Sequence, residues 1–508
     1  MKCQEKKTKS TFIIIGGGIA GVTCAEHLNL LCPDKKVTLI TATDLVKAVV
    51  NLNQYGRYIE DFDVEEKSVD SFSSGLSNLT VVKGKVKDFN PEDHYVTTSD
   101  GRVYEYEKLL ISTGGSPRLI DDSNPHVIGI RDTHSVQYFK TRLTDARRVA
   151  VIGNGGIAME LVFELTGHEV LWAIKHDSIG NHYFDKGAAS FLLSHLESTN
   201  TPRPKEPVIK RIKYGRIVGK ELSPASLEDK SLSEGGVIGG ALGPDWSQGL
   251  SLHSDSTEDS YRNIHIEYKC EVEKILTPQN LLDQNFEETP FPRNKCLYEE
   301  STQWPVYVKL TNGKIYGCDV VVSATGVTTN TAPFISNAPF HIATDGGIKV
   351  DDNMRSSIPD VYAAGDVCTT SWEPSKLWFQ MRLWTQARPM GAFAAHCMSD
   401  NLKGQQVPLD FCFELFTHVT KFFGFKVVLL GKYNAQGLGN DYQLLLRCTK
   451  GVEFVKVVMQ NGRMVGAVLI GETGLEETFE NLILNEIDLS GFEDSLLDSR
   501  VDIEDFFD

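Results

Sequence analysis

The most regular apolar pattern in the chain is a short run that ends in glycines. Thr11–Ile15 has the composition of a buried strand, and the small-residue turn Gly16–Gly21 follows it directly. Apolar and small residues then recur at Val22, Ala25 and Leu28, which predicts a helix. The start of the chain therefore predicts a strand, a tight turn and a helix.

Glycine spacing gives this turn a chemical meaning. Gly16, Gly18 and Gly21 fit G-x-G-x-x-G, with Ile19 and Ala20 between the last two glycines. The first glycine permits the turn, the second lets backbone approach a pyrophosphate, and the third lets the helix pack on the strand. We therefore predict a dinucleotide site at this helix N-terminus.

The second predicted strand, which ends at Ile40, departs from the usual pattern. An acidic residue is expected there to hold the adenosine ribose, but Thr41 takes its place and Asp44 comes three residues later. Thr41 could still bond the ribose through its hydroxyl or backbone. Lys47 opens a segment through Leu52 that we predict to be helical.

A second glycine turn follows a strand at Val149–Ile152. Gly153, Gly155 and Ala158 fit G-x-G-x-x-A, with Ile157 inside the motif. Two such units predict two nucleotide sites or a tandem fold. Lys175 stands at the end of the next strand, where a basic residue can accept the 2′-phosphate of NADP. An ordinary surface lysine is the alternative.

Three further strands end in small residues. They end at Ser112-Thr113-Gly114, at Ala324-Thr325-Gly326 and at Ala364-Gly365-Asp366. At the first of these turns the chain could pass close to a bound cofactor and cross to another domain. A helix signal runs from Leu383 to Ala394, and strands followed by a final helix predict a C-terminal α+β domain after Pro408.

Between about residues 177 and 262 the dinucleotide pattern lapses. A proline-rich basic stretch, Thr201–Pro207, precedes a Gly- and Ser-rich tract, Ser231–Ser260. We expect a surface insertion here. It could carry partner contacts, or it could be poorly ordered padding.

Composition narrows the function. At 508 residues the chain predicts two to four domains. Its net charge of −17 argues against direct nucleic-acid or anionic-membrane binding. No apolar run approaches the roughly 18 residues of a membrane helix. The ten cysteines form no C-x-x-C pair, and we predict no metal site.

Taken together, these motifs make the chain resemble the pyridine nucleotide-disulfide oxidoreductase family, the flavoproteins with two dinucleotide-binding domains. The resemblance implies tandem Rossmann-like FAD and NAD(P) domains (glutathione-reductase-like) plus a small C-terminal α+β domain. It divides the chain into an FAD domain (11–130 and 336–404), an NAD(P) domain with the insertion (131–335) and the C-terminal domain (405–500). It also implies that Asp366 hydrogen-bonds the ribityl chain of FAD.

The chain departs from that family where disulfide chemistry would occur. Disulfide reductases place cysteine beside the flavin, but Leu45–Asn53 contains none. Cys368 is the remaining candidate, and a buried bystander is the alternative. In thiol-free relatives a lysine near flavin N5 pairs with a glutamate after the second glycine motif. The resemblance gives those roles to Lys47 and Glu160. For Glu160, an acid favoured by the helix dipole is the alternative.

Trp378 is expected to border the isoalloxazine ring, with core packing as the alternative reading. The resemblance implies an FAD-dependent NAD(P)H oxidoreductase without a redox dithiol, which passes hydride to flavin N5 and then electrons to oxygen, a quinone-like acceptor or a protein. The other hypothesis is a slow-turnover NAD(P)H-sensing flavoprotein that acts as a binding module. The resemblance also suggests a protein of cytoplasm and nucleus, with an oxidative-protection role linked to the tRNA ligase complex.

Overall fold

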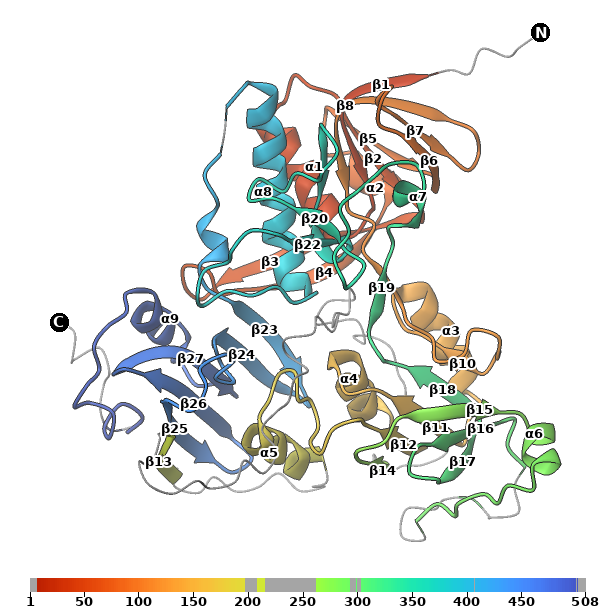
Figure 1. The fold of residues 1–508 in the computed structure, drawn as a ribbon, viewed down its shortest axis with the longest axis vertical. Coiled ribbons are helices and arrows are strands. Elements are labelled where there is room, and N and C mark those ends of the chain that lie inside the picture. Colours follow the sequence, from red (N-terminus) through yellow and green to blue (C-terminus); the bar gives the residue numbers. More distant parts are fainter. Residues whose placement is uncertain are drawn as a thin grey trace. The chain divides into compact units, whose positions relative to one another are not determined.

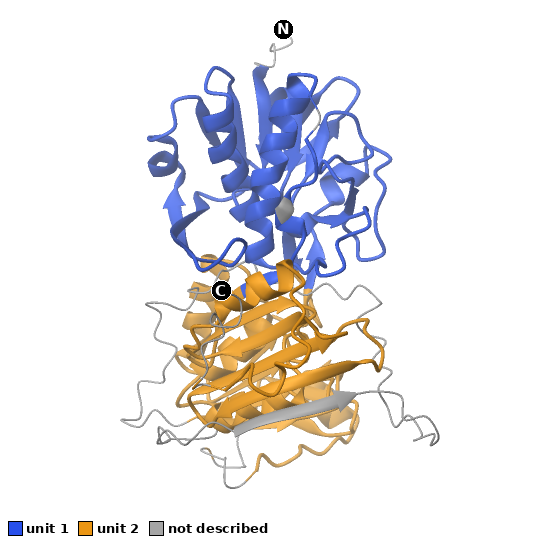
Figure 2. Ribbon diagram, turned by 90° about the vertical axis from the view of Figure 1, so that its left-hand side faces the viewer, with its two compact units in different colours: residues 1–116, 221–245, 327–418 blue, residues 117–220, 246–326, 419–508 orange. Residues whose placement is uncertain are grey.

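The computed structural model describes residues 7–196, 208–214, 262–292, 298, 303–405, 407–498 and 500. The chain divides into two compact units (Figure 2). Unit 1 contains the described residues of Met1–Ser116 and Val327–His418. Unit 2 contains those of Pro117–Lys220, Trp246–Gly326 and Val419–Asp508. Both units are therefore assembled from stretches that are far apart in the sequence.

Unit 1 is built on a seven-stranded sheet whose central strands are parallel. Strand β1 (Thr8–Ile15) lies between β2 (Val37–Thr41) and β8 (Val103–Ile111), and β21 (Val361–Ala363) also pairs with β8. The register aligns the carboxyl ends of β1, β8 and β21. The three small-residue turns that follow these strands consequently meet at one edge of the sheet.

Two helices lie side by side against this sheet (Figure 1). Helix α1 (Ile19–Leu31) follows the first glycine turn, and α8 (Trp384–Leu402) returns late in the chain. Their approach depends on Gly391, because a Cβ atom there would lie 2.2 Å from the carbonyl oxygen of Ala20. The predicted return helix is confirmed.

The segment after β2 is a strand, so the helix predicted from Lys47 to Leu52 is wrong. Strand β3 (Leu45–Gln54) forms an antiparallel hairpin with β4 (Glu60–Ser68). Val46 and Ala48 are buried, while Lys47 between them is only partly covered. This alternation is the two-residue period of a strand, which long-range pairing imposes on a locally ambiguous sequence.

The other described elements of unit 1 complete the sheet and its flanks. They are α2 (Val69–Ser73), β5 (Leu79–Lys83), β6 (Val86–Asn90), β7 (Tyr95–Thr98), β9 (Gly115–Pro117), β19 (Val327–Thr329), α7 (Ala332–Ile335), β20 (Ile348–Val350), η3 (Gly365–Val367), β22 (Cys368–Thr370) and η4 (Phe411–Phe413).

Unit 2 contains a second, five-stranded parallel sheet, with the order β10-β18-β11-β12-β14. Its second glycine turn joins β11 to α4, as the sequence predicts. The elements of this part are β10 (Val127–Ile128), α3 (Thr133–Leu143), β11 (Arg148–Ile152), α4 (Gly156–Glu164), β12 (Glu169–Ala173), β14 (Asn263–Glu267), β15 (Val272–Leu276), α6 (Pro278–Asp283), β16 (Val306–Leu310), β17 (Ile315–Cys318) and β18 (Val320–Ser323).

A six-stranded antiparallel sheet, with the order β13-β25-β26-β27-β24-β23, forms the C-terminal part of unit 2. The strands and helix predicted after Pro408 are confirmed. The elements are β23 (Thr417–Phe422), β24 (Phe425–Gly431), β25 (Tyr442–Thr449), β26 (Glu453–Gln460), β27 (Arg463–Ile470) and α9 (Glu476–Leu484).

Two elements of the predicted insertion are built into unit 2. Strand β13 (Val208–Tyr214) pairs antiparallel with β25, along the edge of the C-terminal sheet. Helix α5 (Lys186–Leu196) packs on that sheet, where the Phe191 ring lies 5.3 Å from the ring of Phe425. The stretches Thr201–Pro207 and Ser231–Ser260 lie outside the described residues.

Candidate functional site

The first glycine turn forms a backbone cradle at the N-terminus of α1. Gly16 has φ +123°, and a Cβ atom there would lie 2.2 Å from the Ser112 carbonyl oxygen. A Cβ atom on Gly21 would lie 2.1 Å from the Gly16 oxygen. Gly18 caps the helix without a side chain, and nothing lies within 4 Å of its missing Cβ position. The turn is thus closed toward the protein and open at Gly18.

Four predicted residues lie close to this turn. Ile19 and Ala20 form the buried first turn of α1. Thr41 is 2% exposed and stands against Gly17, where an added Cβ would lie 2.6 Å from the threonine Oγ1. The backbone N–H of Lys47 donates to the Gly17 carbonyl oxygen at 2.9 Å. The nearby carboxylate, Asp44, forms an exposed ion pair with Lys83 instead.

The crossover after β8 is held by the returning chain. The Thr113 hydroxyl donates to the Asn330 carbonyl oxygen at 2.8 Å, and the Asn330 N–H donates to the Gly114 carbonyl oxygen at 2.9 Å. Gly114 has φ +64°, a left-handed conformation that favours glycine. These contacts fix the crossover beside the first glycine turn, where Ser112 also donates to the Ile15 carbonyl oxygen.

Sequence reasoning missed the residue that anchors Asp366. Asp366 is 8% exposed, and its carbonyl oxygen accepts a hydrogen bond from Arg382 Nε at 2.6 Å. Arg382 is itself 4% exposed and pairs with Asp345 at 3.0 Å. The only sequence signal was an arginine shortly before a predicted helix, because the carbonyl that it binds comes from a separate element.

Trp378 lies in an aromatic cluster. Its ring stacks on Trp372 with centroids 6.2 Å apart, and it meets Phe413 edge to face at 5.3 Å. Trp384, at the first position of α8, contacts the buried His418 ring at 5.0 Å. A position for Trp378 beside the isoalloxazine stays a prediction.

The second cradle repeats the geometry of the first. Gly153 has φ +136°, and a Cβ atom there would lie 2.1 Å from the Ala324 carbonyl oxygen. Gly155 caps α4 without a side chain. Within α4, Ile157 is half-buried and Ala158 is fully buried.

Asn154 ties the second cradle to the loop after β12. Its Nδ2 donates to the Ser178 carbonyl oxygen at 2.9 Å, and its Oδ1 accepts from the Gly180 N–H at 2.7 Å. On the strand side of the cradle, Gly326 has φ +97°. The side chain of Asn154 therefore holds the loop after β12 against the second cradle.

The two residues of the predicted Lys–Glu pair belong to different units. Glu160 is half-buried on α4 in unit 2, whereas Lys47 belongs to unit 1. Their pairing stays a prediction. Lys175 is 65% exposed and lies 3.6 Å from Glu271. This is a solvated ion pair at the expected strand end, and a role in 2′-phosphate recognition also stays a prediction.

Cys368 is not a reactive thiol. It is fully buried, and its Sγ donates to the Gly365 carbonyl oxygen at 3.3 Å. Burial raises its pKa to about 12, which suppresses the nucleophilic thiolate. The cysteines in the described part of the chain are all free thiols. Within the same described part, no cluster of side chains could hold a metal ion, and no helix is long and apolar enough to cross a membrane.

Both cradles fit a dinucleotide. Each offers a helix N-terminus capped by a glycine without a side-chain hydrogen bond, and a neighbouring carbonyl excludes a side chain at the first glycine. At Gly18 of the first cradle the approach is open. Such geometry suits a pyrophosphate that must approach backbone N–H groups closely. The buried carboxyl-bearing turn at Asp366 adds a polar group beside the first cradle, as binding of a ribityl chain requires.

Comparison with known proteins gives these cradles their cofactors. A family profile described as pyridine nucleotide-disulphide oxidoreductase matches residues 10–231 and 294–391. The mouse pyridine nucleotide-disulfide oxidoreductase domain-containing protein 1 is 52% identical over 507 residues, which cover 99% of this chain and 100% of that protein. The Dictyostelium discoideum protein of the same name is 36% identical over 561 residues, covering 99% and 100%.

Solved structures establish the fold. A ferredoxin reductase from Rhodopseudomonas palustris is 17% identical with a TM-score of 0.62, and the match covers 96% of this chain and 98% of that one. The water-forming NADH oxidase of Lactobacillus brevis is 16% identical with a TM-score of 0.61, covering 95% and 92%. The predicted tandem Rossmann-like architecture is confirmed. The chain is therefore an oxidoreductase that binds FAD and NAD(P)H, and it belongs to the pyridine nucleotide-disulphide oxidoreductase family.

Proposed function

We propose that this protein is an NAD(P)H oxidoreductase that works without a redox-active dithiol and delivers electrons to oxygen, a quinone-like molecule or a protein. One observation carries the proposal. The first cradle is complete, yet the segment that would hold the thiol pair is the cysteine-free strand β3. The cysteine nearest in sequence to Asp366, Cys368, is buried and protonated.

Bound FAD would supply hydride and electron transfer, and the chain would supply position and charge. The first cradle would hold the pyrophosphate, while Asp366 would orient the ribityl chain. Lys47 has its backbone fixed to the glycine turn, so its ammonium could stabilise negative charge near N5. Glu160 would hold that ammonium in place. Lys175 supports a preference for NADPH with tolerance of NADH.

A second proposal concerns a binding role. The alternative is a slow-turnover NAD(P)H-sensing flavoprotein that acts as a redox-dependent binding module. In cytoplasm and nucleus it would protect a partner, the tRNA ligase complex, from oxidation. The burial of Cys368 supports it, because a reduced flavin would have no reactive thiol at this position as an electron acceptor. In this reading, NAD(P)H would select the binding-competent state.

An anaerobic titration of the FAD-loaded protein with NADPH or NADH, followed by air, separates the two proposals. Rapid bleaching and rapid recovery of the flavin absorbance are expected for the oxidoreductase. A long-lived reduced species that air barely touches would favour the binding module instead. Recovery of the flavin absorbance that requires an added disulfide would contradict both.

The charged pair is tested in the same assay. Lys47→Met is expected to slow flavin bleaching while leaving flavin content unchanged, because only the side chain is removed. Glu160→Gln should produce a smaller slowing of the same step. Lys67→Met, on the paired strand β4, is the matched control. Equal rates in all three variants would remove Lys47 from the proposal.

A further inference from the structure

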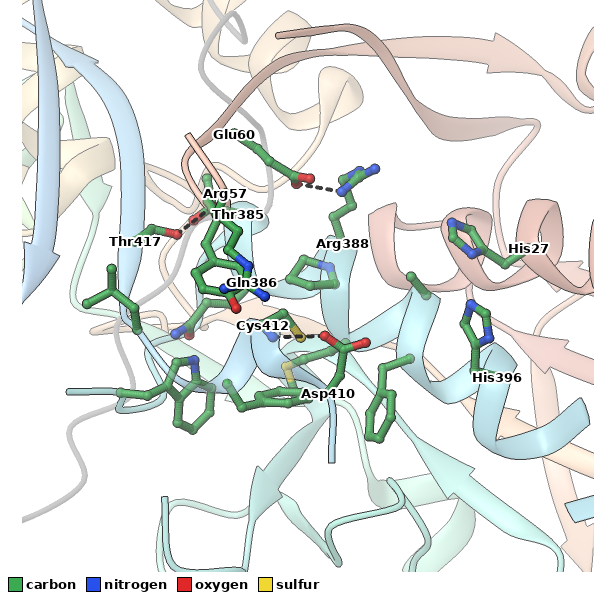
Figure 3. Close-up of a pocket in the computed structure, with 18 residues that line it drawn as sticks. His27, Arg57, Glu60, Thr385, Gln386, Arg388, His396, Asp410, Cys412 and Thr417 are labelled. Carbon is green, nitrogen blue, oxygen red and sulfur yellow. Dashed lines mark hydrogen bonds and ion pairs between the residues drawn. The ribbon is translucent and has the colours of Figure 1, made fainter. Parts of the chain in front are cut away.

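Unit 1 contains a cavity of about 300 Å³ that the cofactor cradles do not explain (Figure 3). On α8, the residues Arg388, Ala392 and His396 line it, and their four-residue spacing puts them on one helix face. Gly391 lies on a different face, against Ala20 of α1. Gly391 does not line the cavity. A volume of this size is at the lower end of the range for small-molecule sites.

One wall of the cavity is aromatic. Phe413 meets Trp378 edge to face at 5.3 Å and Phe393 at 5.5 Å. Trp378 is 4% exposed and Phe413 2% exposed, so the rings are fixed by packing. Fixed aromatic faces and edges favour a planar ring as the ligand.

Two imidazole rings supply polar groups to the cavity. His27 on α1 and His396 on α8 meet edge to face, with ring centroids 5.9 Å apart (Figure 3). Within the part of the chain that the structure describes, neither ring has a hydrogen-bond partner. Burial lowers the pKa of His27, and the charges of His396 and Arg388 lower it further. Arg388 therefore contributes positive charge near His27.

The carboxylates of the cavity are already engaged. Glu60 accepts an ion-paired hydrogen bond from Arg388, and Asp410 accepts from the Cys412 backbone N–H at 2.8 Å. Neither acid contributes to the resolved pKa shift of His27. An anionic group beside the two imidazoles would meet their N–H donors.

We propose that this cavity is a binding site for a planar aromatic acid, whose rings lie against Trp378, Phe393 and Phe413 and whose anionic group accepts hydrogen bonds from His27 and His396. The site is separate from the cofactor cradles. None of the cradle glycines lines the cavity, so its occupation is tested with FAD and a nicotinamide nucleotide bound.

Calorimetry with the full-length, FAD-loaded protein tests the proposal. The probes are 2-naphthoate and its uncharged methyl ester, both in saturating NAD⁺ so that the nucleotide site is filled. We expect one naphthoate site per chain. His27→Phe and His396→Phe keep the ring contact but remove the donors, so each should weaken naphthoate binding roughly tenfold or more. Binding of the ester should stay unchanged.

Two further variants make the result specific. Ala392→Trp fills the cavity and should abolish binding of both probes. His341→Phe alters an exposed imidazole outside the cavity and should change neither. Absence of naphthoate binding, its displacement by NAD⁺, or full binding in both cavity histidine variants would each overturn the proposal.

Discussion

The guanidinium of Arg382 is bonded to the backbone of Asp366, with Nε 2.6 Å from the carbonyl oxygen. The same guanidinium pairs with Asp345 at 3.0 Å, and both partners are largely buried. Because the guanidinium charge of Arg382 is paired with Asp345, its burial is tolerated. The bond from Arg382 to the Asp366 carbonyl oxygen holds the turn before Cys368 in place. Arg382 is therefore a positioning residue for the side chain of Asp366.

Arg382→Met is expected to weaken FAD binding by about tenfold or more, since the carbonyl of Asp366 loses its partner and Asp345 becomes an unpaired buried charge. The dissociation constant of FAD, measured by flavin fluorescence on the deflavinated protein, checks this. Arg102→Met removes an exposed arginine of unit 1 and should leave FAD binding unchanged. Addition of Asp345→Asn to Arg382→Met should recover stability without recovering FAD affinity.

Gly18→Ala and Gly16→Ala should fail in different ways. A methyl group at Gly18 enters open space, so the deflavinated variant should melt near the deflavinated wild type while FAD binding is lost. A methyl group at Gly16 collides with backbone at 2.2 Å and φ +123°, so unit 1 should unfold at lower temperature. Gly75→Ala, also in open space, is the control for both. Retention of FAD by Gly18→Ala would mean that the first cradle does not hold the pyrophosphate.

Cys368→Ala is expected to leave the NAD(P)H oxidation rate unchanged. The thiol is buried and its pKa is raised to about 12, so almost no thiolate exists at neutral pH. In the native protein, a thiol-reactive chromogenic disulfide should leave Cys368 unlabelled, as peptide mapping would show. Loss of turnover in Cys368→Ala, with flavin content intact, would restore a thiol mechanism.

A buried ion pair in unit 2 predicts an asymmetric stability result. Lys456 is 1% exposed and donates to Asp185 at 2.7 Å, whereas the Asp185 side chain is 36% exposed. Asp185→Asn leaves a buried ammonium without its counter-ion, which should cost about 3–5 kcal/mol in the free energy of unfolding. Lys456→Met should cost less, because water can solvate the remaining carboxylate. Urea denaturation followed by circular dichroism measures both.

The same pair predicts a pH dependence. Burial raises the pKa of Asp185, but the charge and hydrogen bond of Lys456 outweigh it, so the pKa ends below its ordinary value. The folded state therefore binds the proton less readily than the unfolded state. The stabilisation is complete above the ordinary aspartate pKa and is lost as pH falls through the lowered value. Acid titration should show this loss in the wild type and not in Asp185→Asn.

The sequence predicted the parts of the fold that local patterns specify. Gly16 and Gly153 each follow an apolar strand directly, which predicts a turn because glycine readily adopts the positive φ that both residues have. The Ala, Val and Leu residues around Lys47 fit the period of a helix as well as that of a strand, and only the pairing of β3 with β4 makes the segment a strand. The role of Arg382 is not predictable from local sequence, because the carbonyl that it binds is brought near by the fold.

The edge strand β13 has a consequence for how the protein is made. Its partner, β25, is synthesised only after β14 and β18 of the five-stranded parallel sheet and after helix α8 of unit 1. Nascent chain leaving the ribosome must therefore carry β13 unpaired for much of its synthesis, with backbone groups that can join a foreign strand. Folding of the antiparallel sheet becomes a late event, and truncated translation products should be prone to aggregate.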